Sequence, residues 1–113
     1  MRTMICLFGL WLMATQAVQA QDTGEATYKS ICIHCHGPNG DGKGHEGMKV
    51  TAADLRSDEV QKKTDEELYQ GIAFGVGHKQ YAHAFAERGM SPKQVMDVVQ
   101  YIRGFAKKSR KSK

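Results

Sequence analysis

The sequence predicts an all-α fold of three to four helices, and two observations lead to this prediction. Three stretches carry apolar residues at the spacing of a helix, and capping residues or glycines mark where these stretches begin or end. No run alternates between apolar and polar residues with the period of two that a half-buried strand would show. The glycine-rich segments between the three stretches are therefore interpreted as connections between helices.

The first helix is expected over about residues 23–35. Positions three or four residues apart share one face of a helix. In this stretch they are Gly24, Tyr28, Ile31, Cys32 and Cys35. Residues 37–44, which follow, are rich in glycine. So many glycines argue against a regular element and let the backbone approach a neighbouring segment closely.

The second helix is expected over about residues 64–75. Thr64 and Glu67 have the spacing of a capping box, in which two side chains and two backbone N–H groups satisfy each other at the helix start. Acidic residues in the first turn favour the same start, because they interact with the positive end of the helix dipole. A further short helix is expected within residues 54–63.

The third helix is expected over about residues 91–106. Ser91 and Gln94 form a second capping box, and Pro92 suits the first helical position because an N–H there would have no helical partner in any case. An apolar stripe then follows the helix. It consists of Val95, Val98, Val99, Ile102 and Phe105. The stripe predicts that this helix packs along its length.

Residues 1–20 are interpreted as a cleaved secretory signal peptide. Arg2 precedes an apolar run of about ten residues, and small or β-branched residues lead up to Ala20. The apolar run is shorter than the roughly 20 residues of a membrane-spanning helix, although a retained N-terminal membrane anchor is the alternative. The mature chain is expected to begin at Gln21, to be periplasmic or otherwise exported, and to hold one domain over residues 21–106.

The positive charge of the chain is concentrated at its C-terminus. Five of the 16 lysines and arginines lie in residues 107–113, and the rest of the expected mature chain is slightly acidic. This distribution does not predict a nucleic-acid-binding face. The basic tail is interpreted either as a solvated, disordered end or as a weak electrostatic contact with an acidic partner or an anionic membrane surface.

Residues 31–37 read ICIHCHG, and Cys32, Cys35 and His36 in this segment have the spacing of covalent c-type haem attachment. Residues three and four apart on a helix point to one side, so both thiols can reach one porphyrin edge while the following imidazole approaches the iron. One covalently bound haem c is therefore expected, with His36 as the proximal ligand. His34 is expected to point away from the ring into solvent.

A cysteine pair at this spacing has alternative uses. A thioredoxin-like redox pair follows a strand in a βαβ unit, and no such strand is predicted here. A structural zinc site requires four ligands in recognisable pairs, and none of the histidines has zinc-finger spacing from the cysteines. The loop between Cys32 and Cys35 is also too short for a disulfide to restrict the unfolded chain much.

With these motifs the chain resembles a small monohaem cytochrome c of the cytochrome c domain superfamily, over almost all of residues 21–113. The matching residues are Gly24 with Tyr28, residues 32–40 (CIHCHGPNG), 52–55, 66–69 with Ile72 and Gly75, 91–92, and 101–103. The resemblance implies a cytochrome c-like fold wrapped around the haem, with the first and last helices crossing at Gly24, Tyr28 and Tyr101. It also implies that redox proteins, a donor and an acceptor, are the partners.

Relatives of this kind usually carry a methionine as the sixth iron ligand, in a segment of the form Met-Pro-x-Phe. The matching stretch here is AHAF, residues 82–85, in which Ala82 takes the methionine position. His83 is the predicted distal ligand, because it lies next to that position in a loop that must cover the haem. Met90 is the alternative, since its distance from His36 along the chain is plausible, although a hydrophobic contact before the third helix also explains it.

Further candidates for the sixth position are His78, Tyr81 and an open site. Met48 is a weak candidate in the loop before residue 52, and Met96 is expected in the core of the third helix. A methionine thioether raises the reduction potential relative to a second imidazole, whereas an open position binds small gases or peroxide. The identity of this ligand therefore decides between functions.

The expected function is that of a soluble, exported carrier that transfers one electron by cycling between Fe(II) and Fe(III), as a monomer or as a dimer. The alternative is a haem-based gas-binding or sensing module with an open or labile sixth position, working alone or as a subunit of a redox complex. A weak peroxidase would need the same open position. No paired catalytic carboxylates, serine nucleophile or phosphate loop indicates another enzymatic activity.

Overall fold

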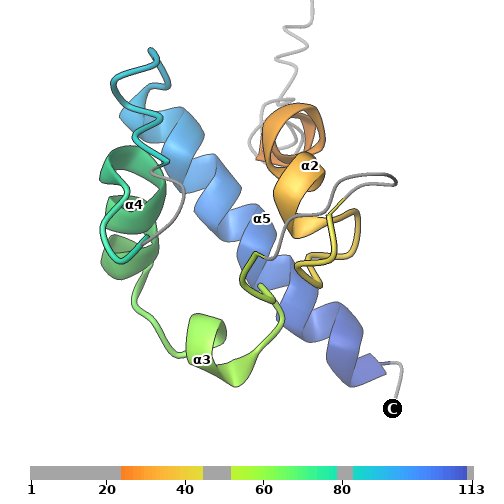
Figure 1. The fold of residues 1–113 in the computed structure, drawn as a ribbon. Coiled ribbons are helices and arrows are strands. Elements are labelled where there is room, and N and C mark those ends of the chain that lie inside the picture. Colours follow the sequence, from red (N-terminus) through yellow and green to blue (C-terminus); the bar gives the residue numbers. More distant parts are fainter. Residues whose placement is uncertain (1–23, 45–51, 79–82, 112–113) are drawn as a thin grey trace, which may run out of the picture.

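The computed structural model describes residues 24–44, 52–78 and 83–111, and these residues form helices and connecting loops without a strand (Figure 1). In chain order the elements are η1 (Tyr28–Cys32), α2 (Ile33–His36), α3 (Asp58–Gln61), α4 (Asp65–Phe74) and α5 (Pro92–Lys111). The all-α prediction is confirmed for this part of the chain, including the short helix within residues 54–63. The predicted signal peptide lies outside the described residues.

Residues 24–36 form one continuous helical segment, as predicted, but its middle is not α-helical. Tyr28–Cys32 adopts π-helical geometry, and the N–H of Ile33 donates to the carbonyl of Tyr28. A π turn holds one more residue than an α turn, so it rotates the residues after it relative to those before it. Gly37, with φ of 79°, ends the segment after α2.

Both predicted capping boxes are present. The N–H of Thr64 donates to the Glu67 carboxylate at 2.7 Å, and the N–H of Glu67 donates to the Thr64 hydroxyl at 3.1 Å. At the start of α5, the N–H of Ser91 donates to Oε1 of Gln94 at 2.9 Å, and the N–H of Gln94 donates to the Ser91 hydroxyl at 3.2 Å. α4 ends at Gly75, whose left-handed conformation is the usual helix stop.

α5 is longer than predicted. The expected end near Ala106 is wrong, because the helix continues to Lys111. No glycine or proline follows Gly104, and lysine and arginine are good helix formers whose charges suit the negative end of the helix dipole. Part of the basic tail is therefore helical, with Lys107 and Lys108 exposed.

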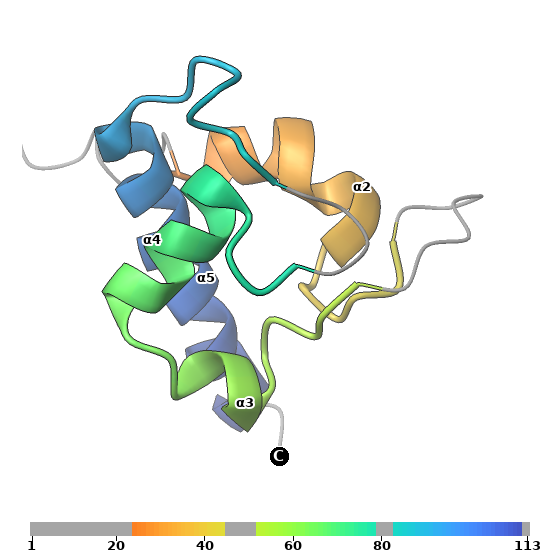
Figure 2. The ribbon, with the colours of Figure 1, turned by 60° about the vertical axis from the view of Figure 1, so that its left-hand side comes forward.

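The N-terminal helical segment lies across α5, as predicted (Figures 1 and 2). At the contact, a Cβ built on Gly24 would overlap the backbone carbonyl of Asp97. Tyr28, Tyr101 and Phe105 pack together beside this contact, with ring centres 5.1, 5.2 and 5.3 Å apart. Only a residue without a side chain lets two helix backbones approach so closely, so the predicted crossing of the first and last helices is confirmed.

α4 also packs against α5 (Figures 1 and 2). Their shared core contains the predicted apolar stripe together with Leu68 and Ile72 of α4. The stripe residues Val95, Val98, Val99, Ile102 and Phe105 are all buried. Because the N-terminal segment and α4 both rest on α5, this one long helix sets how far apart they lie.

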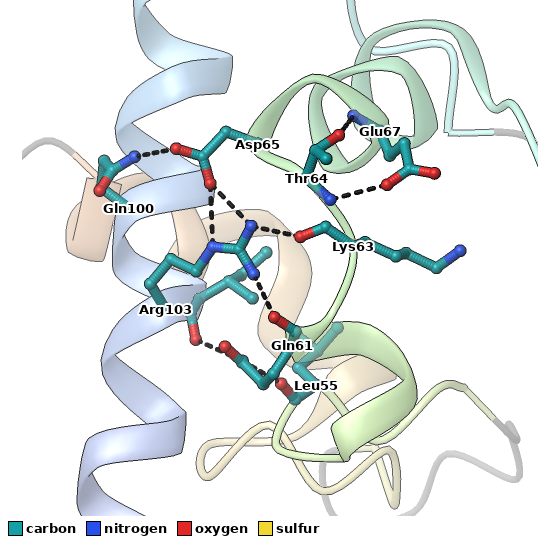
Figure 3. A network of polar contacts seen from close by, with 9 residues as sticks. Leu55, Gln61, Lys63, Thr64, Asp65, Glu67, Gln100 and Arg103 are labelled. Carbon is teal, nitrogen blue, oxygen red and sulfur yellow. Dashed lines mark hydrogen bonds and ion pairs between the residues drawn. The ribbon is translucent and has the colours of Figure 1, made fainter.

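Arg103 joins α5 to the connection between α3 and α4 (Figure 3). Its Nε and Nη2 donate to the Asp65 carboxylate at 2.9 and 2.7 Å. Its Nη1 donates to the Gln61 carbonyl at 2.9 Å, and Nη2 also donates to the Lys63 carbonyl. The side-chain amide of Gln61 in turn donates to the Ile102 carbonyl of α5 at 3.1 Å. These bonds fix the start of α4 against α5.

Candidate functional site

Cys32 and Cys35 lie at the C-terminal end of the N-terminal helical segment, where Cys32 ends η1 and Cys35 belongs to α2. Both side chains are half-buried, and neither cysteine is in a disulfide. Burial, with a smaller contribution from Cys35, raises the pKa of the Cys32 thiol to about 11. A thioredoxin-type pair needs a cysteine whose pKa is lowered, so the surroundings of Cys32 argue against that use.

His36 is the last residue of α2, and only 8% of its surface is exposed. Its Nδ1 lies 3.1 Å from the carbonyl oxygen of Ala53. A carbonyl only accepts hydrogen bonds, so Nδ1 carries the proton and Nε2 keeps its lone pair. Burial lowers the pKa of His36, against the opposing effect of the Ala53 carbonyl. His36 is therefore a neutral imidazole whose Nε2 suits a metal ion.

The glycine-rich segment brings Ala53 to His36. The N–H of Gly42 donates to the His36 carbonyl at 2.9 Å, and the N–H of Ala52 donates to the Gly42 carbonyl at 3.3 Å. Gly42 has φ of 77°, and a Cβ on it would overlap the Ala52 carbonyl. Glycine is thus required at this position for its conformation and for the close approach.

His83 lies near His36, and the centres of the two imidazole rings are 6.0 Å apart. Nδ1 of His83 lies 3.0 Å from the carbonyl oxygen of Gly71 in α4. The same reasoning places the proton on Nδ1 and the lone pair on Nε2. Burial lowers the pKa of His83 to about 4, and the neighbouring His78 makes a smaller contribution in the same direction. His83 is therefore a second uncharged imidazole.

The chain after His83 is held against α4. Ala84 has φ of 44°, a left-handed conformation that costs a residue with a Cβ about 1 kcal/mol. Beyond this turn, the N–H of Phe85 donates to the Ile72 carbonyl at 3.2 Å, and the Phe85 ring stacks beside the His83 ring with 5.4 Å between centres. The strained residue therefore sits between two residues whose positions are fixed by α4.

This donor set fits haem c. Metal–imidazole bonds are about 2.0 Å long, so two histidines that hold one metal ion from opposite sides have ring centres roughly 6 Å apart. The separation between His36 and His83 has this value. Each Nδ1 also lies on a backbone carbonyl, a common outer contact of metal-bound histidine. Cys32 and Cys35, in the same helical segment as His36, add the two thiols that covalent attachment requires.

Of the other described candidates, His78 lies beside His83, with 3.7 Å between their ring centres, whereas Met90, Met96 and His34 have other surroundings. Met90 is half-buried and packs against the core, and its N–H donates to the Phe85 carbonyl at 3.0 Å. Met96 also packs against the core, and His34 is exposed. The candidates Met48 and Tyr81 lie outside the described residues, as does Ala82, which takes the position of the expected methionine. The described candidate with a ring contact to His36 is His83, at 6.0 Å between ring centres.

Two contacts of the site have no signature in the sequence. The carbonyls of Ala53 and Gly71 orient the two histidines, and every residue has a carbonyl, so residue type does not reveal them. The π turn that ends at Cys32 likewise has no signature in the sequence. The one available signal was the matching segment at residues 52–55, which marks the chain near Ala53 without assigning it a role.

Comparison with known protein families gives a match over residues 19–102 to the family described as cytochrome C oxidase, cbb3-type, subunit III. This match covers most of the chain, including Cys32, Cys35, His36 and His83. The chain belongs to this cytochrome c family. A comparison with curated proteins finds none that matches it.

Membership of the cbb3-type subunit III family implies haem c as the cofactor and haem-based electron transfer with redox partner proteins. Cytochromes of type c are in general electron carriers and exported proteins. Within the described ranges of this family member, no helix has the length and apolar character needed to cross a membrane.

Proposed function

We propose that the chain is an exported, single-haem electron carrier whose iron is held between His36 and His83. Cys32 and Cys35 form the two thioether bonds, and His36 is the proximal ligand. When bound, haem c supplies a one-electron Fe(II)/Fe(III) couple. The chain itself supplies the ligands, a dry environment and a docking surface.

The pair of histidines carries this proposal. Their ring centres are 6.0 Å apart, and each Nδ1 is turned to a backbone carbonyl. Both rings are uncharged, because burial lowers the pKa of each. Two histidines on one iron leave no open position for a gas or for peroxide, and closed coordination of this kind suits electron transfer rather than catalysis.

The core keeps this pair in place. The Gly71 carbonyl belongs to α4, and His36 belongs to α2, and the segments that contain them both rest on α5. His83 itself lies in a loop, but its Nδ1 is held by the α4 backbone, so the distance between the two imidazoles depends on how α4 and the N-terminal segment pack on α5. A ligand tied to a packed helix is expected to hold its geometry better than one on a free loop, so little rearrangement is expected when the iron changes oxidation state.

Carbon monoxide binding to the reduced protein tests the closed site. The wild-type protein is expected to be low-spin and to react slowly with the gas, whereas His83→Ala is expected to react rapidly because its sixth position is open. His34→Ala removes an exposed imidazole between the cysteines and is the control. Rapid reaction of the wild type would favour the gas-binding module. A closed site in His83→Ala would mean that another residue is the sixth ligand, and Met90 would then be the first to test.

Mass spectrometry tests the attachment, the processing and the number of haems. Expressed with a c-type maturation system, the chain is expected to begin at Gln21, after loss of residues 1–20, and to carry one covalent haem on its domain of residues 21–106. The double variant Cys32→Ser, Cys35→Ser is expected to carry none. A colourless protein, or haem retained by the double variant, would contradict the attachment.

The family description favours one further arrangement, in which the carrier works as a subunit of a redox complex. The basic end of α5 and the tail, residues 107–113, would then attract an acidic partner in a salt-dependent way. Oxidation of the reduced protein by a membrane fraction, measured at several salt concentrations, tests this for the full chain and for a variant lacking residues 107–113. An unchanged salt dependence in the shortened chain would exclude a steering role for the tail.

A further inference from the structure

His78 packs directly on the proposed distal ligand. The ring centres of His78 and His83 are 3.7 Å apart, with an angle of 54° between the ring planes. His78 follows the end of α4, where its N–H donates to the Gly75 carbonyl at 3.1 Å. The position of its backbone is thus fixed by the turn that ends α4, and the electron-carrier function described above gives His78 no role.

Both His78 and His83 contact α4 at Gly71. Its carbonyl accepts the hydrogen bond from Nδ1 of His83 at 3.0 Å. A Cβ built on Gly71 would lie 3.5 Å from Cε1 of His78, so the His78 ring covers the α-carbon of the same residue. His78 therefore fills the corner between the α4 backbone and the His83 ring.

The His83 ring is enclosed on its remaining described sides. Phe85 stacks beside it, with 5.4 Å between ring centres and 27° between planes, and His36 faces it at 6.0 Å. The Gly71 carbonyl holds one ring nitrogen, and the His78 ring lies against the His83 ring at 3.7 Å between centres. Among the described residues, removal of the His78 ring would leave the His83 ring with the Gly71 hydrogen bond, the Phe85 stacking and the contact with His36.

We propose that His78 is a positioning residue, which braces the His83 imidazole in the orientation that faces His36 and so slows its departure from the iron. This inference rests on the proposed function, because it takes His83 as the distal ligand. Packing between two aromatic rings shifts an equilibrium by about two- to tenfold. Removal of the His78 ring is expected to raise the population of open sites by a factor in that range.

The test is the rate of carbon monoxide binding to the ferrous holoprotein at saturating gas, where departure of the sixth ligand limits the rate. His78→Ala is expected to bind about two- to tenfold faster than the wild type, and His78→Phe, which keeps a ring, is expected to restore a rate near that of the wild type. Val76→Ala is the matched control, because it shortens an exposed side chain in the same turn. Circular dichroism verifies that each variant is folded.

His83→Ala, measured in the same series, separates this inference from the proposed function. An open site in His83→Ala together with a wild-type rate in His78→Ala overturns the bracing role and leaves the electron carrier intact. A closed site in His83→Ala would contradict both the bracing role of His78 and the role of His83 as the distal ligand. A fully open site in His78→Ala would make His78 the ligand itself, and acceleration that His78→Phe does not reverse would show that ring packing is not the cause; either result overturns the bracing role.

Discussion

The backbone of Gly24 lies directly on the backbone of Asp97, and a Cβ on Gly24 would come within 2.7 Å of the Asp97 carbonyl carbon. This contact is where the N-terminal helical segment crosses α5. The same segment ends in Cys35 and His36, so the crossing decides where the proposed haem ligands are presented. The closeness of one backbone to another thus controls the geometry of a site at the other end of the helix.

Gly24→Ala is expected to destabilise the protein. The new methyl group would overlap a backbone carbonyl, which cannot move aside as the end of a side chain can, and overpacking of this kind costs roughly 1–3 kcal/mol. The better helix propensity of alanine, about 1 kcal/mol, offsets part of this cost. Denaturant unfolding of the holoprotein measures the difference in the free energy of unfolding.

Gly104→Ala in α5 is the matched control. Among the described residues, nothing lies within 4 Å of a Cβ built on Gly104. The same substitution without a backbone clash is expected to stabilise the protein by up to about 1 kcal/mol. A gain of stability in both variants would mean that the two helices are not as close at Gly24 as the structure has them.

Arg103→Ala is expected to lower the free energy of unfolding by about 1–2 kcal/mol. Arg103→Lys is expected to show most of the same loss. A lysine has one ammonium group and cannot reach the Asp65 carboxylate and the Gln61 carbonyl at once, as the guanidinium does. Arg56→Ala is the control, because the ion pair of Arg56 with Asp54 is local and lies on the surface, and surface pairs contribute little. A comparable loss in Arg56→Ala would contradict the special role of the Arg103 network.

Asp65→Asn is expected to have an effect that depends on pH. Hydrogen bonds from Arg103 lower the pKa of Asp65 below its ordinary value of 3.8. A carboxyl group whose pKa is lower in the folded state contributes stability above its unfolded pKa and loses it as the pH falls through the folded value. The melting temperature of Asp65→Asn should therefore be below that of the wild type at neutral pH, and the gap should close below pH 3.8. A gap independent of pH would exclude the charge as its cause.

Helix starts were predictable because their signals are local. The capping boxes at Thr64 and Ser91 act between residues three positions apart, and both formed. The end of α5 was not predictable, because a basic run after Ala106 fits a helix and a solvated tail equally well. The π turn of Tyr28–Cys32 also has no local signal, and Tyr28 within it is fully buried against two rings of α5.

The same division holds for the candidate site. The spacing of Cys32, Cys35 and His36 is local, so the sequence alone predicts it as a unit. His83 was a candidate through the mismatch with a family segment, but its approach to His36 depends on how α4 and the N-terminal segment pack on α5. The ring contact of His78 with His83 depends on the turn after α4, and nothing in a linear pattern predicts such a contact.

Tyr28→Phe is expected to cost about 0.5–1.5 kcal/mol in the free energy of unfolding. The Tyr28 hydroxyl donates to the Gly37 carbonyl at 2.7 Å in a buried position. The same carbonyl also accepts from the N–H of Gly40 at 3.2 Å, so the expected loss is that of one buried hydrogen bond. Burial also raises the pKa of Tyr28 far above its ordinary value, so the hydroxyl remains a donor. Tyr101→Phe, which keeps its ring contacts with Tyr28 and Phe105, is the control. Equal losses in the two variants would contradict a specific role of the Tyr28 bond.

His83→Met is expected to raise the reduction potential. The substitution replaces the proposed second imidazole by a thioether, which favours ferrous iron, and the change is expected to be on the order of 0.1 V within the span of about 0.8 V that axial ligands cover. A spectroelectrochemical titration measures it. His83→Ala separates loss of the imidazole from gain of the thioether, because it opens the site without offering a new ligand. If His83→Met kept both the wild-type potential and the wild-type low-spin spectrum, His83 would not touch the iron, and its 6.0 Å approach to His36 would be a packing contact with no part in electron transfer.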